Sequence, residues 1–326
     1  MKARTQILLD RMLAGDRIAL AKLMTLVESR ALETPEIMSR VHKQAGRAYI
    51  VGITGPPGAG KSTLLDRVVS QFRAAGRAVG IVAVDPSSPF SGGAVLGDRI
   101  RMQRHFLDEG VFIRSLSARG SMGGLARAAR DIARLLDAFG KDLVIVETVG
   151  VGQSEFDIMR LAHTVVVVLV PEAGDTVQAM KAGLLEIADI FVVNKADREG
   201  ADRMKSELEM MLQLRPSNGW SVPVLLTVAT DGSGLPQLVS AIEEHGRYLS
   251  DSGEGTARAA SARRAEFLSL LKEEISRRLE RGIRAGPAAD LLSQVERGES
   301  DPYGAVLELL GDEKLCLSVI KPSGGS

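Results

Sequence analysis

The chain has 326 residues, of which 45% are hydrophobic and 25% are charged. These values are ordinary for a globular protein with a sizeable core, built as about two domains or as one large domain with helical additions. Basic and acidic side chains number 41 each. The resulting net charge of zero removes the electrostatic argument for nucleic acid or an anionic membrane as a partner.

Cysteine content and hydropathy indicate the cellular compartment. The single cysteine, Cys316, excludes an internal disulfide framework and a cysteine-based metal cluster, and it is typical of a reducing compartment. No apolar run approaches the ~20 residues that span a bilayer, and the first residues lack the apolar block of a signal peptide. We therefore expect a cytoplasmic protein.

The N-terminal part of the chain predicts helices. Residues 5–30 have the periodicity of two amphipathic helices, broken near Ala14-Gly15-Asp16. We expect both helices to pack on the domain that follows.

From residue 49 onward, short apolar runs alternate with helical stretches such as 62–75, 124–139 and 203–214. Continuous β-branched runs between helices are typical of a parallel sheet that is covered on both faces. The runs that predict strands are residues 49–53, 79–84, 111–113, 143–146, 165–170, 190–193 and 222–228.

Near Gly253 the chain becomes small and polar (DSGEGTARAASARRAE), which indicates a linker. A long charged helix over 262–282 and a shorter apolar helix around 303–310 are expected after it. The amphipathic segment AEFLSLLKEEISRRLERGI needs a partner surface. A second copy of the chain is the economical choice, and packing onto its own domain is the alternative.

The strongest motif is GPPGAGKST at residues 55–63, which follows a predicted strand and opens a predicted helix, as a P-loop requires. Its glycines let main-chain N–H groups curl around phosphates, and the helix N-terminus adds partial positive charge. Lys61 is expected to reach the β- and γ-phosphates, and the Ser62 hydroxyl to bind Mg²⁺. The residues expected to contact the nucleotide here are Gly55, Pro56, Pro57, Gly58, Ala59, Gly60, Lys61, Ser62 and Thr63.

A second motif, NKAD at residues 194–197, indicates the base. The Asp197 carboxylate can accept from both N1–H and the 2-amino group of guanine, a pair of bonds that adenine cannot make. Asn194 is expected to hold the loops around the base, with the stem of Lys195 along its face. The segment LLTVATDGSG resembles a further base-contacting loop, with the contacts at Val228, Ala229 and Thr230.

The stretch VIVETVGVGQSE, residues 144–155, resembles a GTPase switch of the form D-x-x-G with glutamate in place of aspartate. Glu147 ends an apolar strand, and the amide of Gly150 is expected near the γ-phosphate. Asp85 ends the strand after the phosphate-loop helix, and Asp98 lies in SGGAVLGDRIRM. Three acids that converge on a phosphate loop, together with Ser62, suit Mg²⁺. The alternatives are a cap or turn role for Asp85, a solvated loop position for Asp98 and a chance match at Glu147.

Together, GPPGAGKST, AVDPSSPFSGGAVLGDRIRM, ETVGVGQSE and NKAD resemble the MeaB/ArgK family of P-loop GTPases, which includes the human methylmalonic aciduria type A protein. That family belongs to a larger GTPase group with glutamate at the switch position, so Glu147 is similar to a group hallmark. The resemblance implies an α/β P-loop NTPase fold with a mostly parallel central sheet flanked by helices. It also implies helical extensions: an N-terminal one at 1–45, the GTPase domain at 46–250 and a C-terminal dimerisation region at 251–326.

The resemblance also implies a function. Members of the family are homodimeric GTPases that attend adenosylcobalamin-dependent acyl-CoA mutases, typically methylmalonyl-CoA mutase. They gate cofactor delivery and protect the mutase, with GTP as substrate, GDP as product and Mg²⁺ as cofactor. Carried over to this chain, Lys61 and Ser62 hold phosphate and Mg²⁺. The acids placed near the metal and the γ-phosphate are Asp85, Asp98 and Glu147.

The family also has a third mobile segment that responds to nucleotide and contacts the partner, here PEAGDTVQAMKAG at residues 171–183. This chain departs from many relatives at Glu172 and Ala182, which affects the partner-facing details. The positions that match the family pattern are Asp175, Gln178 and Lys181.

The implied reaction is attack of water on the γ-phosphorus, in which positioning and charge neutralisation do most of the catalysis. Gln153 is a candidate for orienting the water, and Arg99 and Arg101 are candidates for an arginine finger. Because this catalytic set is incomplete, we expect slow intrinsic hydrolysis that a partner accelerates by ordering the switches.

Three alternatives stay open. The first is a nickel chaperone of the same GTPase group, although one cysteine and four scattered histidines offer no metal cluster. The second is a kinase that passes phosphate to a transport protein. The third is a non-catalytic scaffold whose nucleotide is structural.

Overall fold

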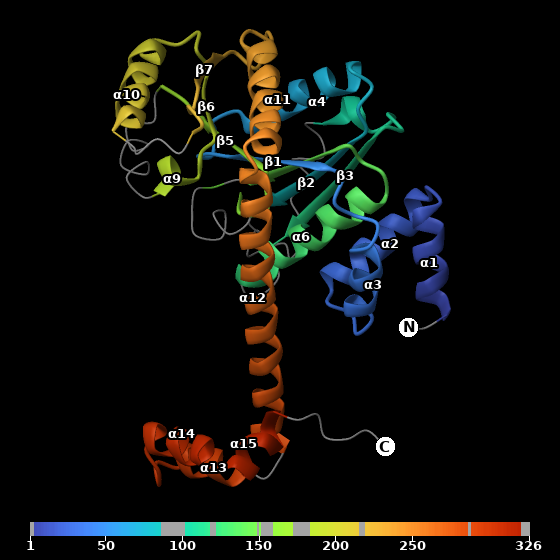
Figure 1. The fold of residues 1–326 in the computed structure, drawn as a ribbon, viewed down its shortest axis with the longest axis vertical. Helices are drawn as coiled ribbons and strands as arrows, with labels where there is room; N and C mark the ends of the chain where they lie inside the picture. Colours follow the sequence, from blue (N-terminus) through green and yellow to red (C-terminus); the bar gives the residue numbers. More distant parts are fainter. Residues whose placement is uncertain are drawn as a thin grey trace. The chain divides into compact units, whose positions relative to one another are not determined.

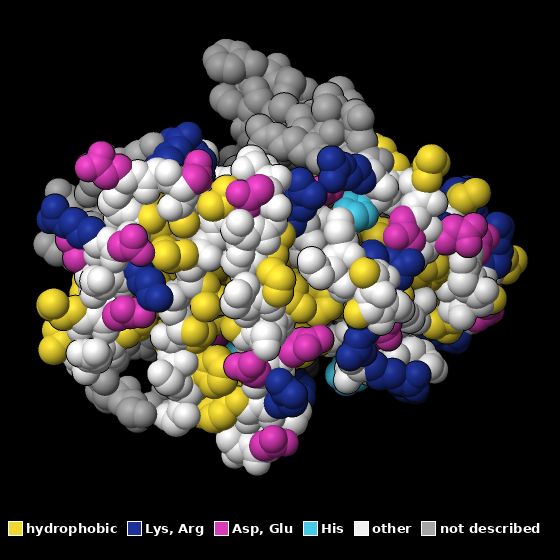
Figure 2. Space-filling model, turned by 90° about the horizontal axis from the view of Figure 1, so that it is seen from above, with side chains coloured by type: hydrophobic (Ala, Val, Ile, Leu, Met, Phe, Trp, Pro, Cys, Tyr) yellow, Lys and Arg dark blue, Asp and Glu magenta, His cyan; other side chains and the backbone are white. Residues whose placement is uncertain are grey.

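The computed structural model describes residues 3–85, 102–117, 122–148, 150, 159–171, 183–214, 219–285 and 288–320. The chain divides into two compact units, Met1–Gly255 and Thr256–Ser326. None of the described helices is both long and apolar enough to cross a membrane. Acidic and basic side chains alternate over the face drawn in Figure 2, without a large area of one sign.

The first unit is built on a seven-stranded sheet in the order β3-β2-β4-β1-β5-β6-β7 (Figure 1). Every pairing in it is parallel. All residues of β4 and β5 are buried, which explains their continuous apolar runs, because both faces of the sheet are covered. The seven predicted strands are confirmed, as β1 (Tyr49–Thr54), β2 (Val79–Asp85), β3 (Val111–Ser117), β4 (Leu143–Thr148), β5 (Thr164–Leu169), β6 (Ile190–Asn194) and β7 (Val224–Thr227).

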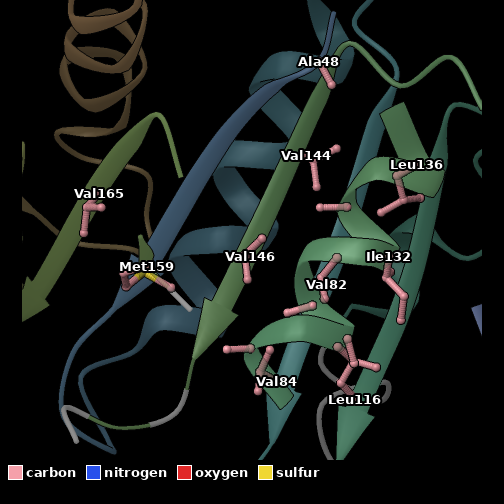
Figure 3. Close-up of a cluster of buried hydrophobic side chains, with 14 of the residues drawn as sticks. Ala48, Val82, Val84, Leu116, Ile132, Leu136, Val144, Val146, Met159 and Val165 are labelled. Carbon is pink, nitrogen blue, oxygen red and sulfur yellow. The ribbon is translucent and has the colours of Figure 1, made fainter. Parts of the chain in front are cut away.

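Helices cover the two faces of the sheet and form two separate apolar cores. The helices α4 (Lys61–Ala74) and α11 (Leu235–Asp251) cover one face, and α6 (Met122–Ala138) and α10 (Ala201–Gln213) cover the other. The short α9 (Leu185–Ile187) lies beside the second core. Figure 3 shows that core, in which side chains of β2, β3 and β4 meet those of α6. The residues labelled there include Val82 of β2, Leu116 of β3, Val146 of β4, and Ile132 and Leu136 of α6.

The N-terminal helices add an outer layer over α6. The helices α1 (Ala3–Leu13) and α2 (Arg17–Glu28) break where the sequence predicts, and the Asp16 side chain caps α2 by accepting from the N–H groups of Ile18 and Ala19. Both α2 and α3 (Thr34–Val41) contact α6, and their apolar residues belong to the same buried core. The expectation that the helices of residues 5–30 pack on the following domain is confirmed: α2 contacts α6 directly, and α1 packs on α2 with Leu9 and Met12 in the same core.

Asp137, in the last turn of α6, also ties down the segment before β1. Its carboxylate accepts hydrogen bonds from the main-chain N–H groups of Gly46, Arg47 and Ala48. One buried side chain therefore satisfies three donors that belong to no regular element, which fixes the entry into the central strand.

The C-terminal region corrects one prediction. The boundary between the two units falls within the predicted linker, at Gly255–Thr256. The stretch is nevertheless helical, because α12 runs from Glu254 to Ala285 and includes most of its small polar residues. Alanine, arginine and glutamate are strong helix formers, so a small polar composition here extends a helix rather than ending it. Gly253, with φ +74°, lies between α11 and α12. The second unit continues with α13 (Ala289–Glu296), α14 (Pro302–Gly311) and α15 (Glu313–Ile320).

Candidate nucleotide site

The predicted phosphate loop lies between the end of β1 and the start of α4, at the carboxyl edge of the sheet (Figure 1). Two of its glycines are required by their surroundings. A Cβ on Gly55 would lie 2.0 Å from the Val168 carbonyl oxygen, and one on Gly60 would lie 2.4 Å from Nδ2 of Asn194. Both residues have positive φ, +148° and +83°, a backbone conformation that residues other than glycine rarely adopt.

Lys61 and Ser62 occupy the first turn of α4, and both are buried. The Lys61 ammonium donates to the carbonyl oxygens of Gly55, at 2.8 Å, and Pro56, at 2.9 Å. The Ser62 hydroxyl donates to Oε1 of Glu147 at 2.7 Å. The structure thus brings together the lysine, the hydroxyl and the switch carboxylate that the sequence assigned to one site.

Gly150 is held near the same point by a pair of threonines. The hydroxyl of Thr54, the last residue of β1, donates to the Gly150 carbonyl oxygen at 2.9 Å. The hydroxyl of Thr148, the last residue of β4, donates in turn to the Thr54 oxygen at 2.9 Å. The switch backbone is therefore attached to the strand that leads into the phosphate loop.

Asn194 connects the phosphate loop to the predicted base loop. Its Nδ2 donates to the Ala59 carbonyl oxygen at 2.8 Å. Its Oδ1 accepts from the Thr227 hydroxyl and from the Ala229 main-chain N–H, both at 3.1 Å. Asn194 is buried, so these bonds form in a poorly solvated environment, where losing a partner is costly.

The rest of the base motif forms a turn that is bonded to the end of β7. Lys195 has a left-handed backbone with φ +56°, and the next N–H, of Ala196, donates to the Thr227 carbonyl oxygen at 3.0 Å. Asp197 is exposed beside this turn. Ala229 is buried, whereas Thr230 is exposed and its carbonyl oxygen accepts from Arg67 of α4 at 2.8 Å.

The structure also locates Val228, Pro57, Gly58 and Thr63. Val228 is half-buried and pairs with Ser233 in an isolated antiparallel bridge. Pro57, Gly58 and Thr63 are exposed on the phosphate loop and the start of α4.

Asp85 is the last residue of β2, which pairs with β4 so that Ala83 lies opposite Glu147. The main chain of Asp85 therefore reaches the same edge of the sheet as Glu147, two positions further along its strand. The other predicted residues lie outside the described part of the chain: Asp98, Arg99, Arg101, Gln153, Asp175, Gln178 and Lys181.

Sequence reasoning missed the threonines that organise these loops. Thr54, Thr148 and Thr227 each end a strand, β1, β4 and β7, and each donates a hydrogen bond at the site. A threonine that ends a buried apolar run at the carboxyl edge of a parallel sheet was the available signal. Arg67 had no comparable signal, because it is one of many arginines on predicted helices.

Known GTPases are similar to this chain over most of its length. The family model of the methylmalonyl-CoA mutase-associated GTPase MeaB matches residues 20–283. A protein of Pyrococcus abyssi that carries the provisional name of a GTPase is 50% identical over 302 residues, which cover 91% of this chain and 93% of that protein. The GTPase ArgK of Escherichia coli is 38% identical over 253 residues, 74% of this chain and 76% of that protein.

A solved structure agrees with the fold. The crystal structure of an LAO/AO transport system kinase superposes with a TM-score of 0.68 at 27% identity, covering 95% of this chain and 98% of that one. The likeness extends over nearly the whole length of both chains.

Proposed function

The chain belongs to the MeaB family of GTPases, and from this premise we propose that it gates an adenosylcobalamin-dependent acyl-CoA mutase, with methylmalonyl-CoA mutase as the first candidate. In this proposal GTP binding and hydrolysis to GDP and phosphate control cofactor delivery and protection of the mutase. The observation that carries the GTPase part is the buried Asn194 amide, which links the phosphate loop to the base loop. The family carries the mutase part.

The residues at the phosphate end have separable roles. The Lys61 ammonium, now bonded to two loop carbonyls, is placed to exchange them for oxygens of the β- and γ-phosphates. Main-chain N–H groups at the start of α4 add positive potential toward the same anion. Gly150, held by Thr54, positions the switch backbone at the γ-phosphate.

The same residues fit Mg²⁺. The Ser62 hydroxyl and the Glu147 carboxylate are hard oxygen donors 2.7 Å apart, and Mg²⁺ takes such ligands together with retained water. Asp85, at the end of the neighbouring strand β2, is proposed to complete the protein's donor set with Asp98. When bound, Mg²⁺ neutralises charge that develops on the transferred phosphoryl group.

The base end gives nucleotide selectivity. Asp197 is exposed at the turn after β6, where its carboxylate can accept from N1–H and the 2-amino group of guanine. The Lys195 stem and the loop at residues 228–230 are proposed to flank the base. Adenine lacks the donor pair, so GTP is expected to be preferred over ATP.

The second unit is proposed to form a homodimer contact. Its helices expose large apolar side chains, with Tyr303 at 85% and Leu307 at 72% exposure on α14, and Phe267 at 64% on α12. Apolar stripes of this kind are covered in stable assemblies, and a second copy provides a matching surface. Light scattering of the purified protein decides between a dimer and packing onto its own first unit. The segment at residues 171–183, with Asp175, Gln178 and Lys181, is proposed to contact the mutase.

Steady-state GTP hydrolysis, measured alone and with purified cobalamin-dependent acyl-CoA mutases, tests the function. Acceleration by one mutase that is lost on Lys61→Ala would support both the GTPase switch and its client. Absence of acceleration by any mutase would reject the client while leaving the GTPase.

A second candidate, phosphate transfer to a protein, is favoured by the name of the kinase structure that this chain resembles. Hydrolysis of γ-labelled GTP in the presence of candidate acceptor proteins separates the two. Label that appears only as free phosphate would reject the kinase function.

A further inference from the structure

The strand β3 lies at the end of the sheet and has β2 as its one strand neighbour among the described strands. Two hydrogen bonds fix which backbone groups face outward. The Val79 N–H donates to the Gly110 carbonyl oxygen within the sheet, at 2.9 Å, whereas the Val111 carbonyl oxygen accepts from Arg17 of α2, at 2.8 Å. Because alternate residues of a parallel strand bond to the same side, Ile113 and Ser115 also direct their N–H and C=O groups away from β2.

A hollow of about 340 Å³ accompanies this edge of β3. Apolar side chains form most of its wall, and Phe106 is 47% exposed there. The next residue, Leu107, is 95% exposed. The lining residues are Arg17, His105, Phe106, Val111, Phe112 and Ile113.

The charge at the hollow favours an anionic group. Among the described residues that line the hollow, Arg17 carries a permanent charge and none has a carboxylate. Its guanidinium is fixed by the carbonyl oxygens of Glu109 and Val111, and lies 5.3 Å from the centre of the Phe112 ring. The neighbouring Asp108 already pairs with Arg73 at 2.8 Å. A negative group brought to the hollow would therefore meet a pre-positioned cation.

The hollow is also connected to the nucleotide helix. His105 closes the short 3₁₀ helix Gln103–His105 and is buried. Its Nε2 lies 3.2 Å from Oδ1 of Asp66 and 3.1 Å from the Asp66 carbonyl oxygen. Asp66 belongs to α4, four residues after Ser62. A ligand that shifts the wall at His105 would thus act on the helix that begins at the phosphate loop.

We propose that the open edge of β3 and its hollow dock an extended segment of the client protein, which adds a strand to the sheet. The docked strand pairs with Ile113 and Ser115, places a large apolar side chain in the hollow and sets an acidic residue against Arg17. Strand addition of this kind takes affinity from main-chain bonds and specificity from a side-chain pocket. The identity of the client as a mutase rests on the proposed function, whereas the edge and hollow do not.

Introducing a negative charge at the rim of the hollow is the direct test, with fluorescence anisotropy of labelled methylmalonyl-CoA mutase as the measurement. Phe106→Glu removes the exposed ring and repels an acidic segment, and we expect the dissociation constant to rise about tenfold or more. Met210→Glu on α10 is the matched control, because Met210 is 66% exposed and α10 contacts β6 and β7 at the other end of the sheet. We expect unchanged mutase binding for the control, and unchanged GTP binding and thermal stability for both variants.

Amide hydrogen exchange tests whether the outward main-chain groups of β3 become hydrogen-bonded. The amides of Ile113 and Ser115 are expected to gain protection when the mutase is added to the wild-type chain. If the wild-type chain binds the mutase, but Phe106→Glu binds equally well and these amides stay unprotected, the docking site is wrong and the proposed function stands.

If the wild-type chain binds no mutase, the proposed client is wrong. A synthetic peptide then tests whether the docking site exists. A labelled peptide of alternating threonine and valine around a central Glu-Phe pair serves as the probe. Saturable binding that Phe106→Glu abolishes and Met210→Glu preserves would retain the docking site for another client. Absence of saturable binding up to millimolar peptide would overturn it.

Discussion

The Ser62 hydroxyl donates a 2.7 Å hydrogen bond to Oε1 of Glu147, joining the first turn of α4 to the end of β4. The two meet because β4 lies beside β1 in the sheet, with Glu147 opposite Ile53 just before the phosphate loop. Glutamate carries one methylene more than aspartate, so its carboxylate extends further from β4 toward α4. The glutamate at position 147, where the usual switch motif has aspartate, therefore has a geometric role: it reaches the Ser62 hydroxyl.

Shortening or neutralising this side chain is expected to impair hydrolysis. Glu147→Asp withdraws the carboxylate from Ser62, and Glu147→Gln retains an acceptor oxygen but loses the charge that favours Mg²⁺. We expect each to lower the single-turnover rate by about 10²-fold, with a raised Mg²⁺ requirement for Glu147→Gln. A wild-type rate for Glu147→Asp would show that the reach of the longer chain is unimportant.

Replacing Asn194 is expected to loosen two loops at once. Asn194→Ala leaves the Ala59 carbonyl and the Ala229 N–H without their buried partner. The free energy of unfolding should fall by about 1–3 kcal/mol, and GTP affinity should fall with it. Chemical denaturation and nucleotide titration measure the two effects. Asp197→Ala is the control, because an exposed residue should lower affinity without changing stability.

Asp197→Asn is expected to change the preferred base. An amide in place of the carboxylate can accept from N1–H of xanthine and donate to its 2-oxo group, whereas it meets the 2-amino group of guanine donor to donor. Competition between GTP and XTP for the variant measures the exchange. Continued preference for GTP would place the guanine edge away from residue 197.

Lys141 gives a pH dependence of stability. Burial, with the nearby charges of Arg17 and Arg73, lowers the pKa of Lys141 to about 8, whereas an unfolded lysine titrates near ~10.4. Between these values the unfolded chain holds more protons, so this residue makes the folded state more stable as pH rises through that interval. The full shift corresponds to about 3 kcal/mol, and solvent screening of the ammonium reduces the gain to about 1 kcal/mol. Below the folded pKa, the lysine is charged in both states and the gain is absent.

Lys141→Arg isolates this effect. Arginine can keep a donor to the Gly110 carbonyl, which Lys141 contacts at 2.8 Å, but stays charged over the whole range. The stability of wild type relative to the variant should therefore increase from pH 7 to pH 10 in denaturant titrations. Parallel curves would mean that Lys141 titrates normally.

The sequence was sufficient to predict the seven strands, because a parallel sheet covered on both faces requires continuous apolar runs. No helix was predicted at α3, since eight residues give little periodicity. It placed a linker where α12 begins, because small polar residues suit both exposed helices and connections. The P-loop glycines were predictable from spacing, whereas the Asn194–Ala59 bond joins residues 135 positions apart. Such a bond follows from how strands order themselves in the sheet, which no local pattern encodes.

The layer of α2 and α3 over α6 has a practical consequence for engineering. A recombinant GTPase fragment cut at residue 46 would strip apolar side chains such as Leu20, Leu23 and Ile37 from the core they share with α6, and would place a new chain end at the Asp137 anchor. Such a fragment should aggregate whatever its nucleotide site can do. An expression fragment should therefore start before Ala3, where the helical layer begins. N-terminal tags and fusion partners should likewise be joined before that residue.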